Sequence, residues 1–240
     1  MTARYRPPWY SRVARFTLRP PFRWLMRAAF RITITGLEHV PKTKPYVVIY
    51  NHVSILDPPL VLGFWPEPLE TVAAIEVFHR RGQNWVVWLY GALPIYRGQP
   101  NRSQLNRMVD VLRSGYPLAI APEGTRSHRP GMRQAWTGLA YVLDQLDTPV
   151  PIVPAGVIGT TDEALALALR GRRPPLTMRV GPAFTLPPLR AWPGPRKRAR
   201  RLNTDLMMYR LAALLPAEYR GAYAAPPPPE LKPYLEDVLP

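Results

Sequence analysis

The sequence contains no cysteine, few acidic residues and no long apolar run. Without cysteine, the chain cannot form disulfides, thiolate zinc sites or a thiol nucleophile. Acidic residues number 16 against 32 lysines and arginines, which leaves a formal net charge of +16. This basic excess predicts anionic partners, such as nucleic acid, anionic lipid headgroups or phosphorylated substrates. Only four basic residues are lysine, and this arginine bias, with the 32 prolines, is also compatible with a GC-rich genome or a hot habitat.

The apolar residues are distributed over short segments. The longest stretch without Asp, Glu, Lys or Arg runs from Gly82 to Tyr96 and holds 15 residues. A helix that crosses a bilayer needs about 18–20 such residues, so no transmembrane span is predicted. The N-terminus is basic but lacks the uninterrupted apolar run of a signal peptide. We therefore expect the protein on the cytoplasmic face of the cell membrane, as a peripheral or monotopic protein.

Residues 1–31 hold eight arginines and no acid. Pro20-Pro21 divides them, and each half has apolar residues at helical spacing, which predicts two amphipathic helices. The apolar stripes are Trp9, Val13 and Phe16, and then Phe22, Leu25, Met26 and Ala29. Arginines 23, 27 and 31 recur on the face opposite the second stripe, which favours helices lying on anionic lipid. The alternative is a helix packed on the domain with a solvated basic face.

Strands and helices alternate between residues 32 and 191. The apolar run Tyr46–Tyr50 is typical of a buried strand, and Asp57-Pro58-Pro59 is a good helix start. The alternation predicts an α/β fold: a single domain with a mainly parallel sheet flanked by helices. Further strands are expected at 32–35, 71–74, 117–121 and 151–157, and helices at 101–113 and 136–146, while 86–90 and 93–96 stay unassigned.

The last 49 residues have a different composition. Trp192-Pro193-Gly194-Pro195 breaks structure, the basic run Arg196–Arg201 follows, and a helical stripe covers 202–213. The Pro226–Pro229 run indicates a polyproline linker or tail. We therefore divide the chain into N-terminal helices (1–31), a central α/β domain (32–191) and a basic helix with a Pro-rich tail (192–240).

The first candidate site is Asn51-His52-Val53-Ser54-Ile55-Leu56-Asp57, directly after the apolar strand. A neutral imidazole can take the proton of an attacking alcohol, and it needs a partner to fix its tautomer. Asp57 is the nearest acid. Five residues turn about 140° on a continuous helix, so His52 and Asp57 meet only if residues 51–56 form a turn. The alternative is a surface histidine beside a helix cap.

The second candidate site is Pro122-Glu123-Gly124-Thr125-Arg126-Ser127, after another predicted strand. Gly124 permits a positive φ or a close approach to a ligand. Arg126 offers a bidentate fork for phosphate, and Glu123 can accept hydrogen bonds from hydroxyl groups. The alternative is a turn held by a salt bridge.

With two further segments, these sites resemble the glycerolipid acyltransferase family, whose best-known members acylate lysophosphatidic acid. The family has four ordered motifs, and all four are present. They are matched by Asn51–Asp57, Gly91–Arg97, Pro122–Ser127 and Val150–Pro154. The resemblance covers roughly Ile34 to Leu186. The first and third motifs are specific in combination, whereas the second and fourth alone are weak.

The resemblance implies an O-acyltransferase in which His52 is the general base and Asp57 orients it. Arg97 and the residues from Glu123 to Arg126 (Glu123, Gly124, Thr125 and Arg126) then bind the acceptor, most simply 1-acylglycerol 3-phosphate, which would become phosphatidic acid. Acyl-CoA or acyl-carrier protein is the co-substrate, with no metal and no cofactor. The expected partners are a membrane surface with anionic lipid, a lysophospholipid and the acyl donor. Many relatives have a lysine shortly before the position of Gly138, where this chain has Ala135-Trp136-Thr137, which leaves the headgroup open.

Two alternatives remain. One is an acyltransferase for a lysolipid with another headgroup. The other is a basic module that binds membrane or nucleic acid through Arg196–Arg201 and the N-terminal arginines. No nucleic-acid-binding motif supports the second, and binding alone requires neither His52 nor Asp57.

Overall fold

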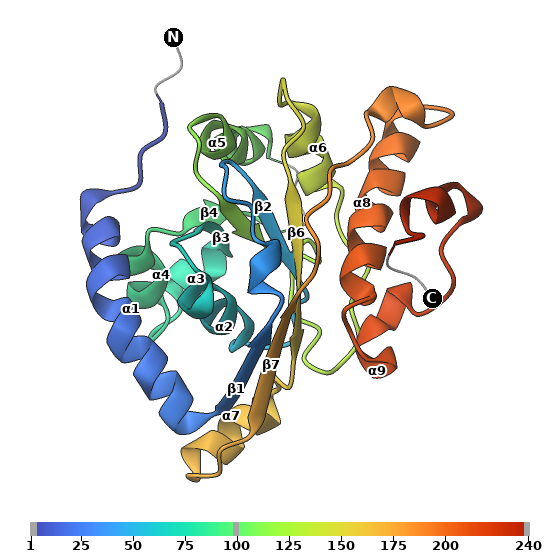
Figure 1. Ribbon diagram of the computed structural model, residues 1–240. Helices are drawn as coiled ribbons and strands as arrows, with labels where there is room; N and C mark the ends of the chain where they lie inside the picture. The colour runs from blue at the N-terminus through green and yellow to red at the C-terminus, as the bar shows by residue number, and fades with distance from the viewer. Residues whose placement is uncertain (1–3, 98–100, 238–240) are drawn as a thin grey trace.

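The computed structural model describes residues 4–97 and 101–237. Its centre is a seven-stranded sheet in the order β1-β7-β6-β2-β5-β3-β4 (Figure 1). The strands are β1 (Arg31–Thr35), β2 (Val47–Tyr50), β3 (Glu70–Ala74), β4 (Leu93–Ile95), β5 (Leu118–Ile120), β6 (Ile152–Ile158) and β7 (Pro175–Val180). Neighbouring strands are parallel except β6 and β7, which are antiparallel. The predicted α/β domain with a mainly parallel sheet is confirmed.

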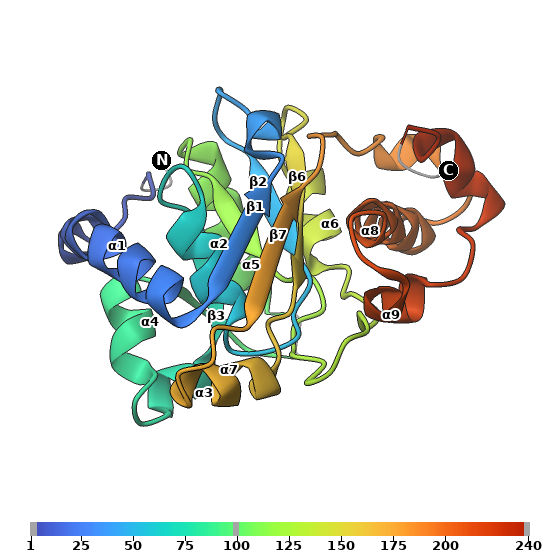
Figure 2. The same ribbon diagram turned by 60° about the horizontal axis from the view of Figure 1, so that its bottom comes forward.

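Helices cover both faces of the sheet (Figure 2). Buried residues of α1 (Trp9–Ala29), α2 (Asp57–Phe64) and α7 (Asp162–Leu169) share one apolar cluster with Val48 and Tyr50 of β2. Those of α5 (Arg102–Arg113), α6 (Gly138–Asp144) and α8 (Arg196–Ala212) share the other with Val47 and Ile49. Successive residues of β2 therefore point into different layers, which explains its continuously apolar sequence.

The segments that the sequence left unassigned form one helix and one strand. Residues 86–90 belong to α4 (Asn84–Tyr90), and residues 93–96 contain β4. Neither segment shows a clear periodicity of apolar residues, because α4 has the exposed apolar side chains Trp85 and Trp88 and β4 has only three residues. The short helices α3 (Ile75–His79) and α9 (Ala217–Arg220) and the 3₁₀ turns Leu37–His39, Leu189–Ala191, Gly221–Tyr223 and Pro229–Tyr234 complete the fold.

The N-terminal segment is one helix, so the predicted break at Pro20-Pro21 is wrong. α1 continues through both prolines for 21 residues. A proline inside a helix costs roughly 3 kcal/mol, and contacts on both sides offset this cost. Arg15 pairs with Glu70 before the prolines, and Arg23 donates to the carbonyl of Gly63 at 2.6 Å after them.

The predicted orientation of this segment also needs correction. Met26 is buried, and Phe22 and Ala29 pack against the same core, so most of the second apolar stripe faces the protein. Arg23 and Arg27 lie over the ring of Phe64 at the end of α2. Arg23 therefore binds the domain, whereas Arg27 packs on the ring and stays solvent-exposed. The first predicted stripe, Trp9, Val13 and Phe16, is solvent-exposed, and so are the large apolar side chains of Leu18, Trp24 and Leu25.

The C-terminal segment packs into the same core as the sheet, which corrects its expected separation from the catalytic domain. Ten residues of α8 are buried. Leu231 and Leu235, beyond the Pro226–Pro229 run, are fully buried in the same cluster. The proline run therefore leads into a packed segment and is not a free tail within the described residues.

Candidate active site

The first and third motifs lie side by side at the carboxyl edge of the sheet. β2 and β5 are parallel neighbours, so the loops that follow them leave the sheet at the same edge. The backbone N–H of His52 donates to Glu123 Oε1 at 2.7 Å, and the N–H of Ser127 donates to the carbonyl of His52 at 2.8 Å. Two segments whose contacting residues His52 and Glu123 are 71 positions apart thus form one hydrogen-bonded unit.

Asn51 fixes the start of the histidine loop. Its side chain is buried and makes two hydrogen bonds to the backbone of Val157 on β6: Nδ2 donates to the carbonyl at 2.8 Å, and Oδ1 accepts from the N–H at 2.7 Å. This pair replaces the strand ladder where β2 has ended. Residues 51–56 can therefore turn away from the sheet while their first residue stays attached to β6.

The turn brings His52 and Asp57 together, which is the geometry that the five-residue spacing required. His52 Nδ1 lies 2.7 Å from Asp57 Oδ2, and the same oxygen accepts from the N–H of Ser54 at 2.8 Å. Asp57 is fully buried at the first position of α2, whereas the His52 side chain is 15% exposed. With Nδ1 directed at the carboxylate, Nε2 is the nitrogen left for a substrate.

Burial raises the pKa of Asp57, and hydrogen bonds to its charged form oppose that rise. The opposing donors are His52, Thr160 and the N–H of Ser54. A buried carboxylate beside an imidazole fixes the tautomer with the proton on Nδ1 and stabilises the imidazolium once Nε2 is protonated. The pair therefore has the arrangement of a general base with its orienting acid.

Glu123 is also buried, and both of its carboxylate oxygens face the backbone. Oε1 accepts from His52, and Oε2 accepts from the N–H of Arg133 at 2.6 Å. Burial raises its pKa to about 7, against the opposing effect of these two donors. Glu123 is absent from the cavity wall. Glu123 therefore ties the His52 loop to the backbone at Arg133.

The remaining predicted residues divide between the cavity and its surroundings. Arg97, Gly124 and Arg126 line the cavity together with His52, whereas Thr125 does not. Gly124 has φ +70°, and a Cβ there would lie 2.9 Å from the ring of Trp136, so the position requires glycine. Neither Arg97 nor Arg126 forms an ion pair with residues 4–97 or 101–237. Both guanidinium groups are available to an anion.

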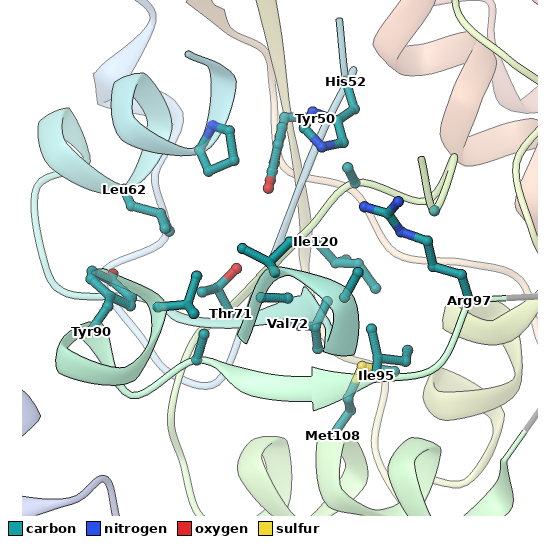
Figure 3. A pocket seen from close by; sticks show the side chains of 18 of the residues that line it. Tyr50, His52, Leu62, Thr71, Val72, Tyr90, Ile95, Arg97, Met108 and Ile120 are labelled. Carbon is teal, nitrogen blue, oxygen red and sulfur yellow. The ribbon is translucent and has the colours of Figure 1, made fainter. Parts of the chain in front are cut away.

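The cavity beside the dyad has a volume of about 1190 Å³ and a mostly apolar wall. Figure 3 shows His52 and Arg97 at one end and Leu62 and Tyr90 at the other. Apolar side chains lie between the two ends, among them Val72, Ile95, Met108 and Ile120. A polar end that continues into an apolar chamber is suited to an amphiphile with a long hydrocarbon chain.

A buried ion pair on the inner side of α1 was not predicted from the sequence. Arg15 Nη1 lies 2.5 Å from Glu70 Oε1, Tyr5 donates to Glu70 Oε2 at 2.6 Å, and the Arg15 guanidinium stacks on Tyr90 at 4.4 Å. Arg15 and Tyr90 also line the cavity. Arg15 is one of eight arginines in residues 1–31, and nothing in the sequence pattern distinguishes it from the other seven.

The sequence was compared with models of known protein families. A model described as "Acyltransferase" matches residues 31–158, which is more than half of the chain. The chain belongs to the acyltransferase family. The matched segment contains β1 to β6 and all four motifs.

Relatives within the acyltransferase family carry consistent names. The chain is 30% identical over 128 residues to "1-acyl-sn-glycerol-3-phosphate acyltransferase alpha" of Mus musculus, covering 51% of this chain and 45% of that protein. It is 26% identical over 141 residues to a 1-acyl-sn-glycerol-3-phosphate acyltransferase of Borreliella burgdorferi, covering 58% and 55%. The chain thus spans about half the length of these curated relatives.

A solved acyltransferase structure has the same fold. The 1-acyl-sn-glycerophosphate (LPA) acyltransferase PlsC from Thermotoga maritima superposes with a TM-score of 0.56 over 80% of this chain and 79% of that one, at 19% identity. The likeness covers more of the chain than the family segment does. It concerns the fold, and the roles of individual residues rest on the geometry of this site.

Proposed function

We propose that the protein transfers a fatty acyl group from a thioester donor to the free hydroxyl of a lysophospholipid, most simply 1-acylglycerol 3-phosphate, giving phosphatidic acid. The observation that carries the proposal is the 2.7 Å contact between His52 Nδ1 and Asp57 Oδ2 beside a cavity that Arg97 and Arg126 also line. The names of the relatives support the choice of acceptor. Either acyl-CoA or acyl-carrier protein can supply the thioester.

The reaction needs one base and no covalent enzyme intermediate. His52 Nε2 takes the proton of the acceptor hydroxyl as its oxygen attacks the thioester carbonyl carbon. Asp57 holds the Nδ1 proton and stabilises the imidazolium that forms. When the tetrahedral intermediate collapses, the C–S bond breaks, and the imidazolium returns the proton to the departing thiolate. The products are the ester and the free thiol.

Arg97 and Arg126 would bind the phosphate of the acceptor. Figure 3 shows the exposed Arg97 at the His52 end of the cavity, and Arg126, which also lines the cavity, precedes Ser127, whose N–H donates to the carbonyl of His52. An arginine fork matches a phosphate group with two parallel hydrogen bonds. The phosphate position would then place the neighbouring glycerol hydroxyl near Nε2, while a hydrocarbon chain extends toward Leu62 and Tyr90.

The membrane would be met by the outer faces of α1 and α4. Trp9, Phe16 and Trp24 on α1 and Trp85 and Trp88 on α4 are all at least 57% exposed. The ring of Tyr10 stacks on Trp88 at 4.6 Å, so the two helices form one continuous surface. Figure 2 shows α1 and α4 side by side on the same flank of the molecule. Tryptophan is favoured at the boundary between lipid headgroups and hydrocarbon.

The position of this surface connects docking to catalysis. Leu18 and Phe22 of α1 and Trp85 and Val86 of α4 line the cavity as well. A lysolipid could therefore pass from the bilayer into the cavity without exposing its hydrocarbon chain to water. No helix within residues 4–97 and 101–237 combines the length and the apolar character needed to span a bilayer.

An activity panel tests the proposal. Purified protein is incubated with labelled acyl-CoA and acyl-carrier-protein donors of several lengths, each against lysolipids with different headgroups and against glycerol 3-phosphate. We expect transfer to 1-acylglycerol 3-phosphate, which His52→Ala lowers by roughly 10²–10⁴-fold because no general base remains. Asp57→Asn should be similarly damaging. Activity only with another headgroup would favour the alternative acceptor, and full activity in a folded His52→Ala protein would exclude this dyad.

A further inference from the structure

One carboxylate oxygen of Asp57 accepts no hydrogen bond from the described residues. Oδ2 accepts from His52 and Ser54. Oδ1 is equally buried but is unpaired among the described residues. A buried carboxylate oxygen without a donor is unfavourable, because desolvation is not compensated. A donor for Oδ1 is therefore expected nearby.

The hydroxyl of Thr160 likewise forms no hydrogen bond with the described residues. Its side chain is fully buried, and Oγ1 has no strict hydrogen-bond partner in the described part of the chain. The nearby Thr160 hydroxyl lowers the pKa of Asp57, against the rise that burial causes. The carboxylate oxygen lacks a donor and the hydroxyl lacks an acceptor, and a hydrogen bond between the two would satisfy both.

The backbone holds Thr160 in this place from two sides. It follows β6, whose Ala155 is in register with Tyr50 of β2, so Thr160 emerges at the same sheet edge as the histidine loop. The N–H of the preceding Gly159 donates to the hydroxyl of Tyr219 at 2.8 Å. Gly159 has φ +85°, and a Cβ there would lie 2.4 Å from the carbonyl oxygen of Pro175. The turn that presents Thr160 is thus tightly constrained.

We propose that Thr160 is a positioning residue for the proposed acyl transfer, whose hydroxyl donates to Asp57 Oδ1 and keeps Oδ2 directed at His52 Nδ1. Without the hydroxyl, one backbone N–H and the imidazole would be the remaining donors to a buried anion. The His52–Asp57 pair would then bind a proton more readily, because the charged carboxylate would be less stabilised. The neutral imidazole needed for catalysis would appear only at higher pH.

Other ionisable groups also face Asp57. They are His52, Glu123, Tyr50 and Tyr219. The tyrosines have raised pKa values and stay neutral at physiological pH. Glu123 has a pKa of about 7 and its charge acts on Asp57, so its own titration falls within the pH range of the experiment. A pH experiment on Thr160 must therefore be repeated in a Glu123→Gln background.

The test compares Thr160→Val, which removes the hydroxyl at nearly constant volume, with Thr160→Ser, which keeps it. For Thr160→Val we expect kcat/KM to fall at least about tenfold and the acid limb of its pH profile to move up by about one pH unit. Thr160→Ser should retain the limb of the unaltered protein. The same upward shift of the acid limb should be seen when the double variant Glu123→Gln/Thr160→Val is compared with Glu123→Gln alone.

A second readout does not depend on activity. The titration of His52 is followed by ¹⁵N NMR, with its signals assigned by comparison with His52→Ala, and its pKa should rise in Thr160→Val but not in Thr160→Ser. If Thr160→Val does not fold, Thr160→Ala takes its place. Lower activity with an unmoved acid limb and an unmoved His52 titration would show a merely structural role and overturn the inference. An inactive but folded unaltered protein would instead refute the proposed acyl transfer, while the NMR titration would still decide the role of Thr160.

Discussion

At the scale of single residues, Arg97 and Arg126 are the cavity cations that we expect to discriminate between the two substrates. Replacing either by alanine should weaken binding of the acceptor, because a charge-assisted hydrogen bond contributes about 1.5–3 kcal/mol. We expect the KM for 1-acylglycerol 3-phosphate to rise by roughly 10-fold or more and the KM for the acyl donor to change little. Steady-state kinetics with each substrate varied in turn measures both.

Arg113 provides a matched control for this comparison. It is an exposed arginine whose contacts are to Gln145 and Asp147, away from the cavity wall. Arg113→Ala should leave both KM values unchanged. A rise confined to the donor in Arg97→Ala or Arg126→Ala would assign that arginine to the donor instead.

Glu123 should give the stability of the protein an unusual pH dependence. Its pKa is about 7 in the folded protein, against an ordinary value of 4.5. The folded state therefore binds this proton more tightly than the unfolded state, so the contribution is fully present below about pH 4.5 and is lost as the pH rises through 7. Urea unfolding at pH values from 4.5 to 8 should show this loss relative to Glu123→Gln. Parallel stability curves for the two proteins would contradict the raised pKa.

How far the site could be predicted differs from residue to residue. His52 and Asp57 were identifiable because their types, their spacing and the preceding apolar strand are all local features. The burial of Glu123 was not, because it depends on the backbone of Arg133 and on a loop 71 residues earlier in the chain. Thr160 has no motif at all and becomes visible only when β6 is placed beside β2.

At the scale of elements, α1 is held to the sheet by a buried charge pair. Arg15 and Glu70 are almost completely buried. Removing one partner of such a pair leaves an uncompensated charge and costs about 3–5 kcal/mol. We therefore expect Arg15→Met to lower the free energy of unfolding by that amount, as measured by urea denaturation. The double variant Arg15→Met/Glu70→Leu should regain much of the loss, since no charge is then left unpaired.

The position of α1 also shows why its orientation was predicted incorrectly. The sequence pattern gives apolar and basic faces but not which of them meets the domain. Aliphatic carbons and guanidinium groups can both pack on a helix end, and here Arg23 binds the carbonyls of Gly63 and Trp65. The apolar residues that remain exposed include the tryptophans, which a purely hydrophobic criterion would have buried.

At the scale of the whole molecule, the exposed tryptophans should determine membrane binding. The variant Trp9→Ser/Phe16→Ser/Trp24→Ser removes apolar area from α1 without touching a buried residue. We expect this variant to lose its binding to anionic vesicles in a co-sedimentation assay, because interfacial binding scales with buried apolar area. Activity on membrane-borne substrate should fall, and activity on a soluble short-chain substrate should be retained.

Substitution is a better test here than removal of the helix. Deleting residues 1–31 would also remove Met26 and Arg15 from the interior, so loss of binding could reflect unfolding. Leu169→Ser is a suitable control, since Leu169 is 81% exposed on α7, outside the α1–α4 surface. Undiminished vesicle binding by the triple variant would direct attention to another surface, first of all Arg196–Arg201.

The pairing of β2 with β6 has a consequence for how the protein is made. Val47 is in register with Ile152, so β2 leaves the ribosome long before its central partner exists. At about 5–20 residues per second, the intervening segment takes of the order of 5–20 s to synthesise. During that time the apolar strand Val47–Tyr50 has no completed sheet to join, and Asn51 has no β6 backbone to bind. The newborn chain therefore passes through an interval in which this apolar strand is unpartnered and its exposure favours aggregation.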